Sequence, residues 1–265
     1  MNKTQMLNRF AADGEQRLEL AYALDQMELT RSRNLPGYTK FLSPATRAAL
    51  QDLLAAAGHP RHLFFGGFEG AERTMCVFLP DWQEEDDWLA QKEKPVAAIR
   101  CTFPEGSKLT HRDFLGGLMG IGIVRACVGD ILVGDGSCDL LVLRSSLTIV
   151  MDQFLQAGRY RMEKRELPLE QLKPAQAEVK EIRDTVATLR LDAVLSSGFS
   201  VSRGRASEFI AAGRVSLNHR ECLKGDKTVA EGDVITCKGL GKCVLKGVLG
   251  QSKKGRIMIE MERFL

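Results

Sequence analysis

The residues with the most distinctive chemistry lie in the stretch SVSRGRASEFIAAGRVSLN, residues 200–218. Ser202 stands where a helix is expected to begin, and Arg203 and Arg205 follow in its first turn. The N-terminus of a helix is the positive end of its dipole, so cations there cost up to about 1 kcal/mol. Free backbone amides and guanidinium groups at one helix start can, however, bind an external phosphate. The stretch therefore predicts a phosphate-binding corner; the alternative is a solvated basic surface.

Other basic and polar residues surround this helix in the last third of the chain. The candidate RNA-binding residues are Arg190, Ser202, Arg203, Arg205, Asn218, Lys227, Lys238, Lys242, Lys253, Lys254 and Arg256. They come from several separate loops and helix starts, and we expect them to gather on one face. Asp192 is expected to orient Arg190 rather than to contact a ligand.

The charge distribution agrees with this placement. The net charge of +3 combines +6 for residues 186–265, from 14 basic and 8 acidic residues, with −3 for the rest. A basic excess confined to one module is a signal for a nucleic-acid partner.

Weaker candidates for RNA contact lie in the middle of the chain. They are Arg73, in the stretch GGFEGAER, and His111 and Arg112, in the first turn of another predicted helix. An ion pair between Arg73 and Glu69 or Glu72 is an equally good interpretation. The middle segment carries no aromatic pair of the kind that stacks bases in true RNA-recognition motifs, so it is expected to bind by shape or to bind protein.

The elements that position these residues divide the chain into three parts and a linker. Residues 1–58 show helical periodicity, and residues 59–165 alternate short apolar strands with two helices, the first opened by a Thr110–Asp113 capping box. We predict an α+β protein with a ferredoxin-like or RNA-recognition-motif-like middle domain. Residues 166–188 are a predicted linker, and residues 189–265 form two short helices followed by strands.

Metal, membrane and disulfide chemistry are not expected. The seven cysteines form no C-x-x-C pair and have no histidine at a zinc-like offset, so we interpret them as buried hydrophobic residues in a reducing compartment. The sequence contains no apolar run long enough to span a membrane. The acidic residues near the N-terminus argue against an import peptide, so we expect a cytoplasmic protein without cofactor or metal.

The C-terminal pattern resembles a known RNA-binding module. RLDAVLSSGFSVSRGRASEFIAAGRVSLN followed by KTVAEGDVI is similar to the S4 domain, named for a protein of the small ribosomal subunit. The matching positions are Arg190, Leu191, Asp192, Leu195, Gly198, Ser202, Arg203, Ala206, Ile210, Gly213, Val215, Asn218, Gly232 and Asp233. This resemblance implies a helix-loop-helix and a β-hairpin that form an L-shaped surface for structured RNA.

The upstream segments extend the resemblance to most of the chain. FFGGFEGAER, HRDFLGGLMGIGIVRACVGDILV and GQSKKGRIMIE are similar to the YlmH family of bacterial proteins. That resemblance implies a helical N-terminus, a middle domain like an RNA-recognition motif, and a C-terminal S4 domain. It further implies binding to rRNA of the large ribosomal subunit, with peptidyl-tRNA as a further partner, in quality control of stalled translation. A monomer without enzymatic activity or small-molecule substrate is expected.

Three further functional classes stay open at this point. An RNA-modifying enzyme of the pseudouridine-synthase type, or its accessory subunit, would use an Arg-Leu-Asp motif, which occurs once, at residues 190–192. Only 73 residues follow Asp192, and no paired acid/base set or phosphate-binding loop occurs in the middle segment. The second class is a ribosome-assembly or division-linked interaction factor. The third is a relative from a photosynthetic organelle, against which the acid-containing N-terminus argues.

Overall fold

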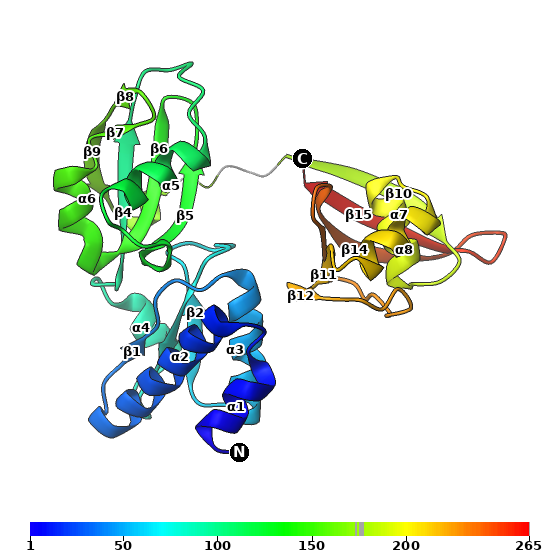
Figure 1. Cartoon of the computed structure of the whole chain (residues 1–265), viewed down its shortest axis with the longest axis horizontal. Coiled ribbons are helices and arrows are strands. Elements are labelled where there is room, and N and C mark those ends of the chain that lie inside the picture. Colours follow the sequence, from blue (N-terminus) through cyan, green and yellow to red (C-terminus); the bar gives the residue numbers. More distant parts are fainter. Residues whose placement is uncertain (173, 175–177, 265) are drawn as a thin grey trace. The chain divides into compact units, whose positions relative to one another are not determined.

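The computed structural model describes residues 1–172, 174 and 178–264. The chain divides into two compact units, Met1–Ala175 and Gln176–Leu265 (Figure 1). Each unit has its own hydrophobic cores. The two units are therefore described one at a time.

The first unit begins with a helical lobe that also contains a small sheet, which we call the N-terminal lobe. Its helices are α1 (Lys3–Phe10), α2 (Gly14–Arg33), α3 (Pro44–Ala56) and α4 (Glu85–Ala90), and its strands are β1 (Gly37–Tyr38), β2 (His62–Phe65) and β3 (Met75–Phe78). The start of α3 follows the predicted signals, because the Ser43 hydroxyl accepts a bond from the Thr46 amide at 3.1 Å and Pro44 occupies the first turn.

The small sheet changes the predicted boundary at residue 58. Strands β2 and β3 were expected in the middle domain, but they pair with each other and with β1, in the order β1-β3-β2. One side chain of β3, Phe78, packs with helix residues such as Leu20 and Leu50 in a single core. The apolar pattern alone identifies the strands but not the sheet they join, because pairing depends on partners distant in sequence.

The rest of the first unit has ferredoxin-like topology, as predicted. Its elements are β4 (Val96–Thr102), α5 (His111–Gly120), η1 (Arg125–Cys127), β5 (Val128–Val133), β6 (Ser137–Leu143), η2 (Arg144–Ser146), α6 (Leu147–Gln153), β7 (Gln156–Ala157), β8 (Tyr160–Arg161), β9 (Glu163–Leu167) and η3 (Leu169–Gln171). The main sheet is antiparallel in the order β5-β6-β4-β9, so two βαβ units interlock around β4 and β6. Helix α6 ends at Gln153, and the hairpin β7–β8 follows.

The two faces of this sheet are covered by different partners. One face carries Ile99, Cys101 and Leu140, which pack with Phe114 of α5 and Val150 of α6. The opposite face contributes Val96 and Leu141 to a core shared with the N-terminal lobe, including Phe41, Met75 and Trp88. Gly129 is required at this contact, because a Cβ there would lie 2.7 Å from the ring of Phe41.

The second unit packs two helices on a six-stranded antiparallel sheet. Its elements are β10 (Val179–Val186), α7 (Leu191–Phe199), α8 (Arg203–Ala211), β11 (Val215–Leu217), β12 (Arg220–Glu221), β13 (Val234–Cys237), β14 (Gly241–Gln251) and β15 (Ile257–Phe264). The strand order is β10-β15-β14-β13-β11-β12. Buried residues of both helices, such as Leu195 and Ile210, pack with Leu245, Ile259 and Met261 of the long hairpin.

The predicted linker is shorter than residues 166–188. Residues 179–186 form β10, which pairs along its whole length with β15, from Val179 opposite Phe264 to Val186 opposite Ile257. The linker was predicted from the charged composition of this segment. Charged residues are also typical of an edge strand, which is the position of β10 in the sheet. Residues 173 and 175–177 of the predicted linker lie outside the described residues.

The cysteines are small buried side chains, as interpreted from the sequence. All seven are free; five are buried, and Cys127 and Cys222 are half-buried. Burial raises the pKa of Cys101 and of Cys243 to about 12, so both thiols stay protonated at neutral pH. In the described part of the chain no helix is long and apolar enough to cross a membrane.

We predict that only Cys127 and Cys222 react rapidly with a thiol reagent such as Ellman's reagent in the native protein. The thiolate is the reacting species, and the five buried thiols, Cys76, Cys101, Cys138, Cys237 and Cys243, are shielded and protonated. Five further equivalents should react only in denaturant. Rapid reaction of more than two thiols under native conditions would contradict the described packing.

Candidate nucleic-acid interface

Asp192 gathers two of the predicted arginines at the start of helix α7. Its carboxylate accepts bonds from Arg190 Nη2 at 2.9 Å and from Arg203 Nη2 at 3.2 Å. The loop that contains Lys227 closes the same helix end, because the Leu191 amide donates to the Lys227 carbonyl at 2.8 Å. Arg190, Arg203 and Lys227, which are up to 37 positions apart in sequence, therefore lie around one helix start. We call these three residues and Asp192 the Asp192 cluster.

The charges of this cluster leave a positive surface. Asp192 is 5% exposed, whereas the side chains of Arg190 and Arg203 are 41% and 54% exposed. Burial raises the pKa of Asp192, but hydrogen bonds from the two guanidinium groups outweigh it and hold that pKa below its usual value. One buried carboxylate thus fixes two guanidinium groups whose outer edges face solvent, as the expected role of Asp192 requires.

A second arrangement of arginines surrounds Phe209 of α8. The guanidinium carbon of Arg205 lies 4.8 Å from the centre of the Phe209 ring, and that of Arg214 lies 4.5 Å from it. Arg205 also pairs with Glu208 at 2.8 Å, and Arg214 donates to the Lys238 carbonyl at 2.5 Å. Stacking on an aromatic face restricts both side chains while their edges stay exposed. We call Arg205, Phe209, Arg214 and Lys238 the Phe209 cluster.

Helix α8 connects the two clusters. Arg203 and Arg205 occupy its first turn, and the Ser202 hydroxyl accepts a bond from the Arg205 amide at 3.2 Å, which confirms Ser202 as the N-cap. Arg214 was not singled out from the sequence. Its position in the sequence could have identified it. Arg214 directly follows Gly213, where the chain turns back after the end of α8.

Asn218 has a structural role that the sequence analysis did not predict. Its side-chain amide donates to Asp233 at 2.7 Å, and its side-chain oxygen accepts a bond from the Val234 amide at 2.9 Å. Both ends of the side chain are therefore used inside the unit. Asn218 and His219 both have positive φ angles, 51° and 64°, so Asn218 also provides the conformation that a tight hairpin needs.

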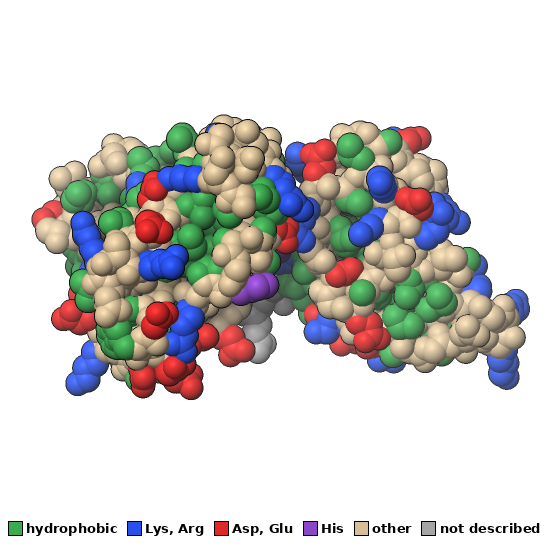
Figure 2. Space-filling model, turned by 90° about the horizontal axis from the view of Figure 1, so that it is seen from below, with side chains coloured by type: hydrophobic (Ala, Val, Ile, Leu, Met, Phe, Trp, Pro, Cys, Tyr) green, Lys and Arg blue, Asp and Glu red, His purple; other side chains and the backbone are tan. Residues whose placement is uncertain are grey.

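Lys242, Lys253 and Lys254 belong to neither the Asp192 cluster nor the Phe209 cluster. The sequence analysis had expected all the basic residues on one face. Lys242 lies at the start of β14 with its ammonium 4.2 Å from the ring centre of Phe264, and Lys253 and Lys254 lie beyond the other end of that strand. An 11-residue strand at about 3.3 Å per residue separates them by roughly 30 Å. Figure 2 likewise shows the basic side chains of the C-terminal unit scattered among acidic and apolar ones on the visible face. Arg256 is held at the base of the tip by Thr185.

Arg73 is a structural residue of the first unit, not a surface cation. Its guanidinium donates to the Val128 and Phe41 carbonyls, each at 3.0 Å, and its amide donates to Asp130 at 3.0 Å. Burial lowers the pKa of Arg73. The bonds to these two carbonyls hold the side chain, and the expected RNA contact of Arg73 stays a prediction. Arg73 instead connects the N-terminal lobe to β5.

His111 and Arg112 lie at the start of α5, which begins as predicted. The Thr110 amide donates to Asp113 at 2.8 Å. Burial, followed by the nearby Arg125 guanidinium, lowers the pKa of His111, so its ring is neutral at pH 7. Arg112 is exposed and lines a groove together with Arg161, which the sequence analysis did not single out.

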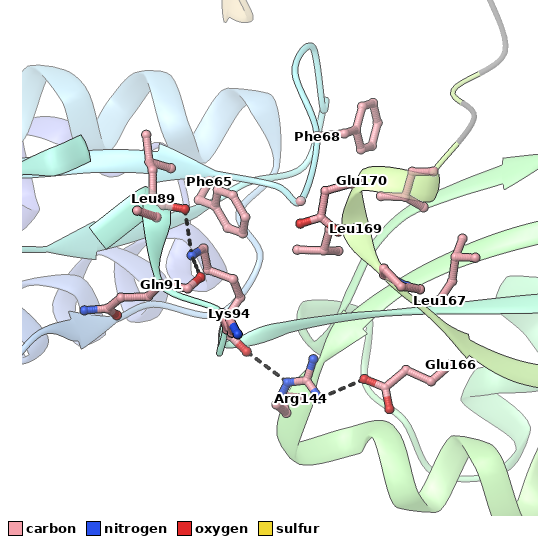
Figure 3. Close-up of a pocket in the computed structure, with 15 residues that line it drawn as sticks. Phe65, Phe68, Leu89, Gln91, Lys94, Arg144, Glu166, Leu167, Leu169 and Glu170 are labelled. Atoms are coloured by element: carbon pink, nitrogen blue, oxygen red, sulfur yellow. Dashed lines mark hydrogen bonds and ion pairs between the residues drawn. The ribbon is translucent and has the colours of Figure 1, made fainter. Parts of the chain in front are cut away.

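A cavity of ≈ 800 Å³ lies between the N-terminal lobe and the ferredoxin-like sheet (Figure 3). Its walls are largely apolar, including Phe65, Phe68 and Leu169. The Lys94 ammonium donates to the carbonyls of Trp88 and Leu89, each at 3.0 Å, and so closes the end of α4. Arg144 bonds to Glu166 at 2.9 Å and to the Lys94 carbonyl at 3.0 Å. These polar groups hold the two parts of the first unit together.

Metal chemistry finds no support in the described ranges, 1–172, 174 and 178–264. No group of three or more His, Cys, Asp or Glu side chains is placed there to hold a metal ion.

Comparison with known proteins identifies two domains, one in the C-terminal unit and one in the ferredoxin-like part of the first unit. Residues 189–235 match the S4 domain, and residues 96–173 match the putative RNA-binding domain in YlmH. The first range contains the Asp192 cluster and Arg205, Phe209 and Arg214; the second coincides with the ferredoxin-like domain. Lys238, Lys242, Lys253, Lys254 and Arg256 lie beyond the S4 match.

Two relatives resemble longer parts of the chain. The ribosome-associated protein quality control protein P2 of Bacillus subtilis (strain 168) is 29% identical over 251 residues, which are 94% of this chain and 95% of the relative. The structure of cell division protein YlmH from Streptococcus pneumoniae aligns with a TM-score of 0.50 and 21% identity, over 62% of this chain and 98% of that one. The latter likeness is one of fold. The resemblance predicted from the sequence is confirmed.

We predict that replacing Asp192 by Asn lowers the free energy of unfolding of the C-terminal unit by about 1–3 kcal/mol at pH 7, because two charge-assisted bonds are removed or weakened. The pKa of Asp192 is lowered by folding, so its contribution is present above the unfolded pKa of about 3.9 and is lost as pH falls through the folded value. The difference between wild type and variant, measured by urea unfolding, should therefore shrink below about pH 4.

A matched control is Glu208→Gln, which removes the exposed carboxylate partner of Arg205 and should change stability by less than about 1 kcal/mol. An effect of Asp192→Asn no larger than that of Glu208→Gln would refute the central place given to Asp192.

Proposed function

We propose that this chain is a member of the YlmH family of RNA-binding proteins and that its C-terminal unit docks on rRNA of the large ribosomal subunit in ribosome-associated quality control. The name of the Bacillus subtilis relative, which aligns along almost the whole chain, supports this process. A ribosomal role implies that the protein works in the cytoplasm. We further propose that it acts as a monomer.

The observation that carries the proposal is the set of four guanidinium groups that are held around α7 and α8. Arg190 and Arg203 are held by Asp192, and Arg205 and Arg214 are held by Phe209. Fixed, exposed guanidinium groups suit phosphate oxygens, since the planar fork loses little freedom on binding. A phosphate-reading surface of this kind recognises the shape of folded RNA rather than its sequence.

The hairpin tip supports a second, separate contact. Lys253 and Lys254 crowd one turn beyond the strand end, and the bonds from Arg256 to Thr185 fix the base of that turn. Like charges at one tip repel each other unless a polyanion neutralises them. We propose that the tip contacts a different RNA element from the α8 surface, and peptidyl-tRNA on the stalled subunit is the candidate that the family resemblance suggests.

We propose a binding role without catalysis. In the enzymatic alternative, the aspartate of Arg-Leu-Asp would act on a nucleotide. Asp192 is instead 5% exposed and bonded to two arginines, which suits a positioning residue. The alternative of a division-linked factor gains no support from the pneumococcal relative, because that likeness concerns fold alone.

We predict that Arg203→Ala combined with Arg205→Ala weakens co-sedimentation with large ribosomal subunits carrying peptidyl-tRNA by at least about tenfold, since bonds to charged groups contribute about 1.5–3 kcal/mol each. The slope of log affinity against log salt should fall by about 0.7–0.9 for each phosphate that is no longer neutralised.

Arg183→Ala is the control, because Arg183 is an exposed arginine on β10 of the same unit that pairs with Glu260. Unchanged sedimentation and salt slope in the double variant, with a normal circular dichroism spectrum, would refute docking through α8.

We also predict that Lys253→Ala with Lys254→Ala reduces affinity for subunits that carry peptidyl-tRNA more than affinity for empty subunits, while the melting temperature stays unchanged. Lys246→Ala on the same hairpin is the control, because its ammonium faces Glu262 at 3.5 Å. An equal reduction for both kinds of subunit would assign the tip to rRNA instead of tRNA.

A further inference from the structure

The sheet surface on which true RNA-recognition motifs stack bases is partly covered in this protein. At one end Val96 and Leu141 are buried against Phe41 and Trp88 of the N-terminal lobe. Elsewhere on that face Arg100 and Asp139 form a two-bond ion pair, with both distances 2.7 Å, and Asp139 is buried. These contacts reduce the area of this face that could stack bases.

A groove on the opposite side of the domain is open to solvent. It lies between the first turns of α5 and the segment that leads from α6 into the β7–β8 hairpin, and its volume is ≈ 660 Å³. Pockets that hold small organic ligands have volumes of about 300–1,000 Å³, so this groove has room for a nucleotide.

The residues that line the groove suit a polyanion with exposed bases. Arg112 and Arg161 contribute two exposed guanidinium groups, and Gln153 and Gln156 contribute amides. The acidic residue in the lining is Asp113, whose carboxylate already accepts bonds from the amide and hydroxyl of Thr110. Leu155 is 60% exposed and provides an apolar surface beside these polar groups.

Gly116 of α5 lines the groove, and the packing of the domain does not require a glycine at this position. A Cβ on its neighbour Gly117 would lie 2.5 Å from the Phe154 ring, so packing explains that glycine. A Cβ on Gly116 would meet no atom within 4 Å. An exposed glycine in a helix interior is less favourable than alanine by about 1 kcal/mol, and it is useful where another backbone must approach closely.

We propose that this groove binds a single-stranded RNA segment, with phosphates at Arg112 and Arg161 and the sugar-phosphate chain passing over Gly116. The inference rests on the proposed RNA-binding function and gives the ferredoxin-like domain an RNA site independent of α8. Arg112 was a sequence candidate; Arg161 and Gly116 are new.

The test uses the full-length protein and a fluorescein-labelled 12-nucleotide oligouridine at low salt, with fluorescence anisotropy as the readout. Arg112→Gln with Arg161→Gln should weaken binding about tenfold or more and lower the salt slope by about 0.7 for each phosphate that is no longer neutralised. Gly116→Ala should raise the melting temperature by a few degrees and still weaken binding. Weaker binding by a more stable protein cannot come from misfolding.

Gly120→Ala is the matched control, because Gly120 belongs to the same helix, has open space around it and lies outside the groove lining. Its oligonucleotide affinity should equal that of the wild type. A 4-thiouridine oligonucleotide should photo-crosslink to residues 153–161.

Several outcomes would overturn the proposal. They are absence of oligouridine binding, binding unchanged in the groove variants, and crosslinks confined to residues 189–264. The groove variants could also bind ribosomal subunits more weakly while their oligonucleotide affinity stays unchanged. That result would assign the groove to a protein partner and would overturn the RNA proposal. Failure of the α8 docking proposal is seen separately, in subunit sedimentation of the Arg203/Arg205 variant.

Discussion

The carboxylate of Asp192 is the point on which the C-terminal surface depends. A buried charge is tolerated only when it is paired, and two guanidinium groups from separate helices supply that pairing. The same bonds position Arg190 and Arg203 beside Lys227, whose loop caps α7. The first turn of α8 holds two cations that the helix dipole disfavours, and each has a carboxylate partner. Arg203 bonds to Asp192, and Arg205 bonds to Glu208.

The ferredoxin-like domain combines a familiar topology with a partly covered sheet face. Its strand order keeps the predicted arrangement, yet the N-terminal lobe occupies part of the face that other proteins of this topology present to RNA. Arg73 strengthens that attachment by bonding to both parts at once. Topology alone therefore does not indicate the binding surface, and the residues on each face have to be considered separately.

The sequence predicts features that depend on local chemistry and misses those that depend on distant partners. The Ser202 cap, the capping box at Thr110 and the helix-ending Gly213 follow from short-range rules, and the structure has them. The internal bonds of Arg73 and Asn218 were not predicted, because a basic or amide side chain resembles a ligand-binding group until its internal partners are known. The sequence also does not show that Lys242 and the pair Lys253 and Lys254 lie at opposite ends of one long strand, β14, and so all three were expected on one face.

The core shared by the N-terminal lobe and the ferredoxin-like sheet has a consequence for dissecting the protein. A fragment cut at residue 95 would keep every strand of the four-stranded sheet but would remove the cover over Val96 and Leu141. Its newly bare apolar face would favour self-association. A fragment that is to keep both faces of the four-stranded sheet covered must therefore include the N-terminal lobe.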